Sequence, residues 1–344
     1  MNPMTKVTLL GIDIAKDIFQ LHGVDASGKA VLKKKLKRAK LLEFIAQLEL
    51  CVIVMEACGG SHYWAREFKK LGHEAKLISP QFVKPFVKTN KNDMNDAEAI
   101  AEAASRPNMR FVPVKTQEQQ DVQCIHRVRE RLVKNRTALV NEIRGLLTEY
   151  GVVAPKGIAK LRALLSEIIG DDDNKFNLTS MLKELCVDIY EELKELDEQI
   201  EQCNRKLEAI ANTNPICQRL MTAPGVGVLT ATILFTVLSD PSLFKNGRHF
   251  AAFLGLVPRQ YSSGGKQKLY GISKRGDKYI RKLLILGAKS VLIKSPKKSD
   301  KRSLWINKLN ERRGANRTCV AIANKNARVV WALAKNATEY KMAV

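Results

Sequence analysis

Two acidic residues of this sequence interrupt or end runs of apolar residues. Asp13 lies within residues 7–19, where β-branched and apolar side chains predict a strand, and Glu56 ends the apolar run of residues 51–56. A buried strand rarely carries an acid, because an unpaired ionised carboxylate in an apolar core costs several kcal/mol. Asp13 therefore needs a basic partner or a metal ion to compensate its charge.

Two further acids, Asp93 and Asp96, stand three residues apart at the start of a stretch of helical character, residues 92–102. This spacing places both acids on one face of a helix. They could simply cap the helix or interact favourably with the helix dipole, but that explains neither Asp13 nor Glu56. We therefore interpret the four acids as one site for Mg²⁺ or Mn²⁺, because metal ions held by carboxylates can assist phosphodiester exchange.

A second candidate for chemistry is a glycine-flanked loop that contains Ser262 and Ser263. A serine hydroxyl there could attack phosphorus while neighbouring cations neutralise the developing charge. These cations are Arg259, Lys266 and Lys268. Tyr261 is a second possible nucleophile in the same loop. By spacing alone, an ordinary turn is the better explanation of Ser-Ser-Gly-Gly.

Positive charge is concentrated in the C-terminal third of the chain. The protein has 58 Lys and Arg against 35 Asp and Glu, a net charge of +23, and residues 245–317 hold 20 basic and 3 acidic residues. Residues 167–208 instead hold 13 acidic and 5 basic residues. Nucleic acid should therefore bind the C-terminal part and avoid the acidic stretch. The expected contacts are Arg259, Lys266, Lys268, Lys274, Arg275, Lys278, Arg281 and Lys282.

The cysteines and the apolar runs indicate where the protein works. Its 7 cysteines form no CxxC pair, which favours reduced thiols over disulfides or a zinc site. The longest apolar run, residues 226–238, is too short to span a bilayer, and no signal peptide is visible. We expect a soluble protein of the prokaryotic cytoplasm, associated with the nucleoid.

The patterns predict an α/β domain followed by helical regions. Three strands followed by alternating helix and strand indicate a mixed sheet with helices packed on it. The expected strands fall in residues 7–25 (two strands), 29–37, 51–56 and 74–78, and the expected helices in residues 41–50 and 62–71. We expect three domains, at residues 1–115, 116–212 and 213–344.

Two long helices should form the middle domain, over residues 116–150 and about 178–210. In the second helix, apolar residues recur at spacings that mostly alternate between three and four, which predicts a coiled-coil seam. They are Leu182, Leu185, Ile189, Leu193, Leu196, Ile200, Cys203, Leu207 and Ile210. A hairpin that only separates two domains and a dimerisation arm explain this pattern equally well. Residues 220–231 then have the form of either a phosphate-binding helix-hairpin-helix or a plain helix connection.

Six segments of the chain resemble the DEDD transposases of insertion sequences, the RuvC-like, bridge-RNA-guided recombinases. They are GIDIAKD, VMEACGG, KNDMNDAEAIAEAA, MTAPGVGVLTA, FAAFLGLVPRQYSSGGK and GISKRGDKYIRKLL, and they span most of the chain in order. The resemblance implies an RNase H-like (RuvC-like) domain with the acids Asp13, Glu56, Asp93 and Asp96. It also implies a mainly helical C-terminal transposase domain whose serine before a glycine, here Ser263, bonds covalently to DNA.

The resemblance also implies the partners: donor DNA, target DNA and a structured guide RNA encoded by the element. We further expect a homo-oligomer, either a dimer or a tetramer, in which the acids could reach the serine from a second subunit.

Three other classes of protein share some of these features. A Holliday-junction resolvase-like nuclease would use the same four acids and a metal-bound water without a serine step. An actin-like ATPase also opens with Gly11-Ile12-Asp13, but it requires a later Asp-Gly-Gly loop and does not explain the basic C-terminal third. An architectural DNA-binding protein would have no use for Asp13 in a strand.

Overall fold

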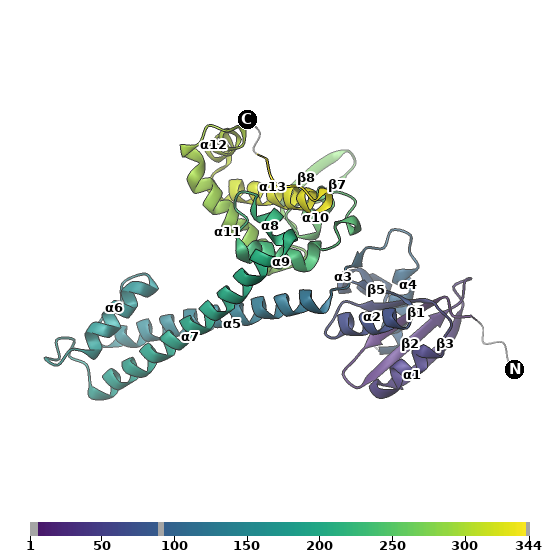
Figure 1. Ribbon diagram of the computed structural model, residues 1–344, viewed down its shortest axis with the longest axis horizontal. Coiled ribbons are helices and arrows are strands. Elements are labelled where there is room, and N and C mark those ends of the chain that lie inside the picture. The colour runs from purple at the N-terminus through teal and green to yellow at the C-terminus, as the bar shows by residue number, and fades with distance from the viewer. Residues whose placement is uncertain (1–5, 89–92, 342–344) are drawn as a thin grey trace. The chain divides into compact units, whose positions relative to one another are not determined.

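The computed structural model describes residues 6–88 and 93–341, with the backbone alone for Asp93 (Figure 1). The chain divides into two compact units, Met1–Glu118 and Gln119–Val344. The expected helical connector and the expected C-terminal domain both fall in the second unit. The division into three domains therefore stays a prediction.

The first unit is built on a mixed sheet with the strand order β3-β2-β1-β4-β5-β6. β1 runs antiparallel to β2 and parallel to β4, β4 runs parallel to β5, and the outer strands β3 and β6 pair antiparallel with their neighbours. The strands are β1 (Leu9–Ile14), β2 (Ile18–Val24), β3 (Ala30–Lys37), β4 (Val52–Glu56), β5 (Glu74–Ile78) and β6 (Phe111–Val112). The predicted mixed sheet is confirmed and is consistent with an RNase H-like domain, while β6 was not predicted.

Helices cover both faces of this sheet. Leu10 and Ile12 of β1 pack with residues of α1 and α2 on one face, while Val54 of β4 packs with Ile100 of α4 on the other. The helices are α1 (Leu41–Ala46), α2 (Ser61–Lys70), α3 (Pro80–Val83) and α4 (Asp93–Ala104), with 3₁₀ turns η1 (Arg38–Lys40) and η2 (Lys84–Phe86). The first helix is shorter than predicted, ending at Ala46 instead of residue 50.

Gly11 of β1 lets α4 lie directly on the sheet. A Cβ added at Gly11 would lie 2.5 Å from the carbonyl oxygen of Ala97 and 2.8 Å from the amide nitrogen of Ala101. Because no real Cβ tolerates such distances, only glycine permits this approach of helix to strand. The glycine two residues before Asp13 thus holds α4 close to β1.

The second unit begins with a long antiparallel helix pair, α5 (Gln117–Glu149) and α7 (Ser180–Thr213), joined through α6 (Ile158–Ile169) (Figure 1). Apolar residues of all three helices form one core, and Arg136 of α5 forms an ion pair with Asp197 of α7 at 2.6 Å. No helix was predicted over the residues of α6. On α7, Cys186 is fully buried and Leu185 is exposed, so the seam differs at this turn from the predicted one. A coiled coil in the strict sense stays a prediction.

The rest of the second unit is mainly helical around a separate core. Its elements are α8 (Pro215–Met221), α9 (Val228–Leu238), η3 (Pro241–Leu243), α10 (Gly247–Phe253), β7 (Pro258–Ser263), β8 (Lys266–Ile272), α11 (Lys278–Lys294), η4 (Ser295–Lys297), α12 (Lys301–Arg313) and α13 (Ala315–Asn336). Within the described residues, no helix combines the length and the apolar character needed to cross a bilayer.

The turn between α8 and α9 is the expected helix-hairpin-helix segment. A Cβ at Gly225 would lie 2.8 Å from the carbonyl oxygen of Gly287 in α11, and Asn326 of α13 donates a hydrogen bond to the carbonyl of Pro224. The turn is therefore packed between two helices of its own unit. This packing accounts for Gly225 without a phosphate contact and favours the plain helix connection.

Candidate active site and nucleic-acid groove

Asp13 and Glu56 occupy neighbouring positions at the carboxyl ends of two parallel strands. The register of β1 and β4 pairs Ile12 with Met55, so the next residue of each strand, Asp13 and Glu56, stands beside the other. Residues in register on parallel strands point to the same face of a sheet. Both side chains are half-buried. Asp13 lies next to the end of its strand, not in the middle of it as predicted.

Both carboxylates lie on the face that α4 covers. Asp13 is two residues beyond Gly11, which contacts Ala97, and Glu56 is two residues beyond Val54, which packs with Ile100. The far end of α4 packs with the beginnings of β1 and β4, because Ala104 shares its core with Leu9 and Val52. The N-terminal end of α4 therefore lies toward the strand ends that carry the two acids.

Asp96 lies in the first turns of α4, half-buried and four residues before Ile100. Since residues four apart share a helix face, Asp96 lies on the side of α4 that packs toward β4. Asp93 begins the helix, and its side chain falls outside the described part. The fold thus assigns the acids of two strands and one helix to the same end of the same face.

Cys58 lies two residues after Glu56, and the pKa of its thiol responds to both carboxylates at these strand ends. Desolvation by surrounding protein atoms, and then the charges of Glu56 and Asp13, raise the pKa of the Cys58 thiol. Both carboxylates therefore lie near one sulfur atom. Among the described side chains, however, no three His, Cys, Asp or Glu residues form a group that could hold a metal ion.

The pair Asp13 and Glu56 fits a divalent metal ion by donor chemistry, since Mg²⁺ and Mn²⁺ prefer carboxylate oxygens. Convergence of all four acids on one metal site stays a prediction.

The two serines lie on a β-hairpin instead of the predicted loop. β7 ends at Ser263, β8 begins at Lys266, and Gly264 and Gly265 form the turn with φ values of 55° and 75°. Glycine adopts these left-handed values at little cost, so the sequence favours a tight two-residue turn here. Every residue of β7 is exposed to solvent.

The hairpin register separates the two serines. Ser263 pairs with Lys266, and Tyr261 pairs with Lys268, so these four side chains share one face. Ser262 pairs with Gln267 on the opposite face, where its hydroxyl accepts a hydrogen bond from the side chain of Gln260 at 2.9 Å. Ser263 is therefore the serine beside two cations.

The same hairpin forms one wall of a groove with a volume of about 1000 Å³, closed on the other side by α12 and α13. Four cations line it: Arg259 and Lys274 from the hairpin region, and Arg313 and Arg317 from the helices. None of these four forms an ion pair with an acid of the described chain. Tyr270 adds an aromatic side chain to the lining. Cations interleaved with an aromatic ring suit a nucleic-acid strand.

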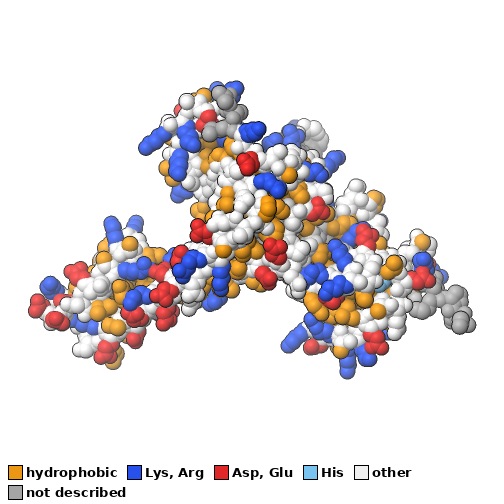
Figure 2. All heavy atoms as spheres, viewed as in Figure 1, with side chains coloured by type: hydrophobic (Ala, Val, Ile, Leu, Met, Phe, Trp, Pro, Cys, Tyr) orange, Lys and Arg blue, Asp and Glu red, His pale blue; other side chains and the backbone are white. Residues whose placement is uncertain are grey.

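Arg313 and Arg317 were not singled out by the sequence, although both lie in its basic region. Residues 301–317 are so rich in Lys and Arg that spacing alone does not distinguish these two. Figure 2 shows Lys and Arg gathered over α11 and α12, and Asp and Glu gathered around α6 and the nearby ends of α5 and α7. The predicted separation of charge is thus visible on the surface of the second unit.

Arg281 is the exception among the expected nucleic-acid contacts. Its side chain is buried, and its guanidinium donates hydrogen bonds to the carbonyl oxygens of Leu254, Arg275, Gly276 and Asp277. All four bonds come from Nη1, so burial and these carbonyls give Arg281 a structural role, and the prediction that it binds nucleic acid stays untested. Lys282 is exposed but lies 3.7 Å from Glu130. The others are exposed, namely Arg259, Lys266, Lys268, Lys274, Arg275 and Lys278.

Replacing Arg281 with leucine should destabilise the second unit by about 3 kcal/mol, because buried carbonyls would lose a charged donor. The measurement is urea unfolding followed by circular dichroism. Lys278→Leu, an exposed residue one turn earlier, is the matched control and should cost little. Equal stability of the two variants would contradict a structural role for Arg281.

Comparison with known proteins supplies the family. Residues 217–303 match the family described as "Transposase IS116/IS110/IS902 family", and residues 10–152 match a family described as "Transposase", that of the DEDD transposases of IS110 elements. The chain belongs to the IS110 family of DEDD transposases. The transposase is therefore an enzyme that acts on DNA. The match over residues 10–152 includes the strand ends with Asp13 and Glu56 (the carboxylate edge), and the match over residues 217–303 includes β7 and β8 (the serine hairpin).

The transposase also resembles curated relatives over nearly its whole length. It is 49% identical to the transposase for insertion sequence element IS1111A of Coxiella burnetii (strain RSA 493 / Nine Mile phase I), over 98% of this chain and 92% of the relative. It is 49% identical to a probable family 20 transposase of Pseudomonas aeruginosa, over 96% and 98%. It is 41% identical to the transposase for insertion sequence element IS1328 of Yersinia enterocolitica, over 98% and 99%.

Proposed function

We propose that this transposase cuts and rejoins DNA strands with Ser263 as nucleophile and with the acids Asp13, Glu56, Asp93 and Asp96 as a metal site. The observation that carries the proposal is the hairpin register, which places an exposed Ser263 on one face with Lys266 and Lys268. Cations beside a hydroxyl stabilise the negative charge that develops on phosphorus during attack.

The serine step conserves the phosphodiester. The Ser263 oxygen forms a bond to phosphorus, the bond from phosphorus to one sugar oxygen breaks, and that oxygen takes up a proton as it leaves. A hydroxyl of the partner strand then attacks the phosphoserine, restores a phosphodiester and returns the proton to Ser263. Asp13 and Glu56 would hold Mg²⁺ or Mn²⁺, which supplies charge neutralisation at the reacting phosphate.

We propose two partners beyond the DNA itself. A structured guide RNA encoded by the element is implied by the sequence resemblance, and the positive charge of residues 245–317 suits it. A second copy of the chain would pack against the α5–α7 hairpin. Exposed apolar residues of α7 support this contact, namely Met181, Leu185 and Val187.

The test of the whole function is strand exchange in a purified system. Donor and target plasmids are incubated with the transposase and Mg²⁺, with and without RNA transcribed from the non-coding DNA that flanks the reading frame. Recombinant joints that depend on both RNA and Mg²⁺ are expected. Cleavage without joining would support the resolvase-like nuclease instead.

The groove beside the hairpin should carry much of the nucleic-acid affinity. Replacing Arg313 and Arg317 with glutamine should weaken binding of duplex DNA by at least about tenfold and flatten its salt dependence, because fewer counterions are released. The measurement is fluorescence anisotropy at several salt concentrations. Lys156→Gln/Lys160→Gln, which removes the same charge near α6, is the control. An equal effect of both variants would show that only net charge matters.

A further inference from the structure

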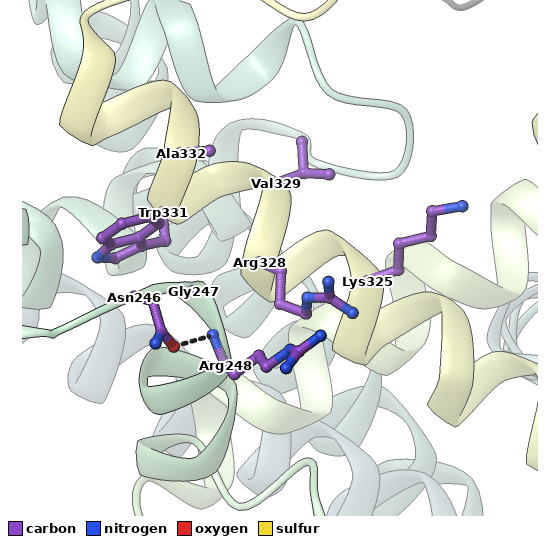
Figure 3. Close-up of a pocket in the computed structure, with 8 residues that line it drawn as sticks. All are labelled: Asn246, Gly247, Arg248, Lys325, Arg328, Val329, Trp331 and Ala332. Atoms are coloured by element: carbon purple, nitrogen blue, oxygen red, sulfur yellow. Dashed lines mark hydrogen bonds between the residues drawn. The ribbon is translucent and has the colours of Figure 1, made fainter.

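A second basic hollow lies in the C-terminal unit, apart from the residues that line the hairpin groove. It has a volume of about 520 Å³ and is formed between the start of α10 and the C-terminal half of α13 (Figure 3). Its cations are Arg248, Lys325 and Arg328, all exposed to solvent. None of them was singled out by the sequence patterns.

Backbone packing fixes the two arginines relative to each other. Gly247 lies against α13 so closely that an added Cβ would be 3.0 Å from the carbonyl oxygen of Arg328. Asn246 accepts hydrogen bonds from the amides of Arg248 and His249, at 3.0 and 3.1 Å, which orients the first turn of α10. Figure 3 shows the guanidinium groups of Arg248 and Arg328 extending to the same side of the hollow.

Within the part of the chain that the structure describes, no acid neutralises the positive charges of this hollow. No acid of the described chain forms an ion pair with Arg248, Lys325 or Arg328, and neither α10 nor α13 contains an Asp or Glu. Lys325 is restrained instead by the ring of Trp305, 4.4 Å from its ammonium nitrogen. The planar donors of the two guanidiniums match phosphate oxygens, so an anion bound in the hollow would offset their positive charge.

Apolar side chains complete the lining. Trp331 is fixed by a hydrogen bond from its indole nitrogen to the carbonyl of Pro241 at 3.0 Å, and Val329 and Ala332 also line the hollow. This mixture suits a phosphate that is attached to a sugar better than a free inorganic ion, because the sugar can pack on the apolar side.

We propose that this hollow binds a backbone phosphate of the nucleic acid that the transposase holds, at a site separate from the hairpin groove. The inference rests on the proposed function, which supplies the nucleic acid. Arg328 follows Arg317 of the groove by 11 residues of α13, which is close to three full turns. The two therefore lie on one side of the helix, about 16 Å apart along its axis, or about five nucleotides of one B-DNA strand.

The test uses the full chain with Arg248→Gln/Arg328→Gln. Fluorescence anisotropy is measured on a labelled duplex DNA of random sequence and on a single-stranded RNA of equal length, at several salt concentrations. We expect the dissociation constant to rise about tenfold and the salt slope to fall by about one for the phosphate lost. The control Lys156→Gln/Lys160→Gln removes two charges elsewhere, and thermal unfolding checks that both variants are folded.

The outcomes separate this site from the proposed function. A loss for both probes supports a shared phosphate contact, and a loss for one probe alone identifies whether DNA or RNA occupies the hollow. An effect no larger than that of the control, while Arg313→Gln/Arg317→Gln still weakens binding, would overturn the second site and leave the proposed function standing. Failure of the wild-type protein to bind either probe would reject the proposed function itself. If the double variant unfolds early, the two single variants serve the same test.

Discussion

Replacing Asp13 with asparagine should abolish strand exchange while leaving DNA binding nearly unchanged. Asparagine has the same shape but no charge, so the pair with Glu56 would lose much of its affinity for a divalent ion. Several kcal/mol of charge stabilisation at the phosphate correspond to a rate loss of at least about a thousandfold. The measurement is the rate of joint formation between donor and target DNA in Mg²⁺, together with the affinity for duplex DNA.

Asp17→Asn is the matched control for this prediction. Asp17 lies four residues further along, exposed in the connection between β1 and β2, and the same substitution removes the same charge there. Strand exchange should proceed at the wild-type rate in this variant. If Asp13→Asn also recombines DNA at the wild-type rate in Mg²⁺, the carboxylate edge is not the metal site.

The carboxylate edge could be predicted in part because strand patterns are local. Alternating and apolar runs gave β4 to within one residue and the bounds of β5 as observed, and neighbouring parallel strands bring their carboxyl ends together. Register then decides whether Asp13 and Glu56 face the same side. No sequence pattern indicated the register of β1 with β4. The structure gives this register through the pairing of Ile12 with Met55.

The serine hairpin could not be predicted because its strands lack any periodic pattern. Every residue of β7 is exposed, so no apolar alternation marks it, and two glycines alone suggested a loop. Only the pairing of β7 with β8 shows which face of the hairpin each serine occupies. Ser262 and Ser263 are indistinguishable by composition, yet they lie on opposite faces of the hairpin.

Local sequence pattern revealed neither the burial of Arg281 nor the helix α6, because packing against other parts of the unit decides both. Arg281 lies in a run of basic residues, but four carbonyl oxygens surround its guanidinium. No helix was predicted over residues 158–169, although they form one whose Leu161, Leu165 and Ile168 complete the core of the α5–α7 pair. Of the four carbonyls, only that of Leu254 is distant in sequence from Arg281, whereas α6 packs on residues of two other helices.

Replacing Ser263 with alanine should eliminate a covalent protein–DNA adduct and lower strand exchange by about ten-thousandfold or more, since loss of a nucleophile removes the covalent route entirely. The adduct is measured on denaturing gels with a labelled DNA substrate. Ser262→Ala, one residue away on the opposite face of the hairpin, and Tyr261→Phe, on the same face, are the controls. An adduct that survives Ser263→Ala but disappears in Ser262→Ala or Tyr261→Phe would assign the role to that residue.

The same variant also tests how the serine is activated. A serine hydroxyl is a poor nucleophile at neutral pH and needs a base or a metal ion, whereas two of the residues on its hairpin face, Lys266 and Lys268, are cations that accept no proton. We propose that the carboxylate site supplies this activation from a second subunit. Ser263→Ala mixed with Asp13→Asn should then recover part of the activity, because one mixed pair carries both an intact serine and an intact set of acids. No recovery in trans, although each variant alone is folded and binds DNA, would place both parts of the site in one subunit. No adduct under any trapping condition would instead favour attack by water, as in a resolvase.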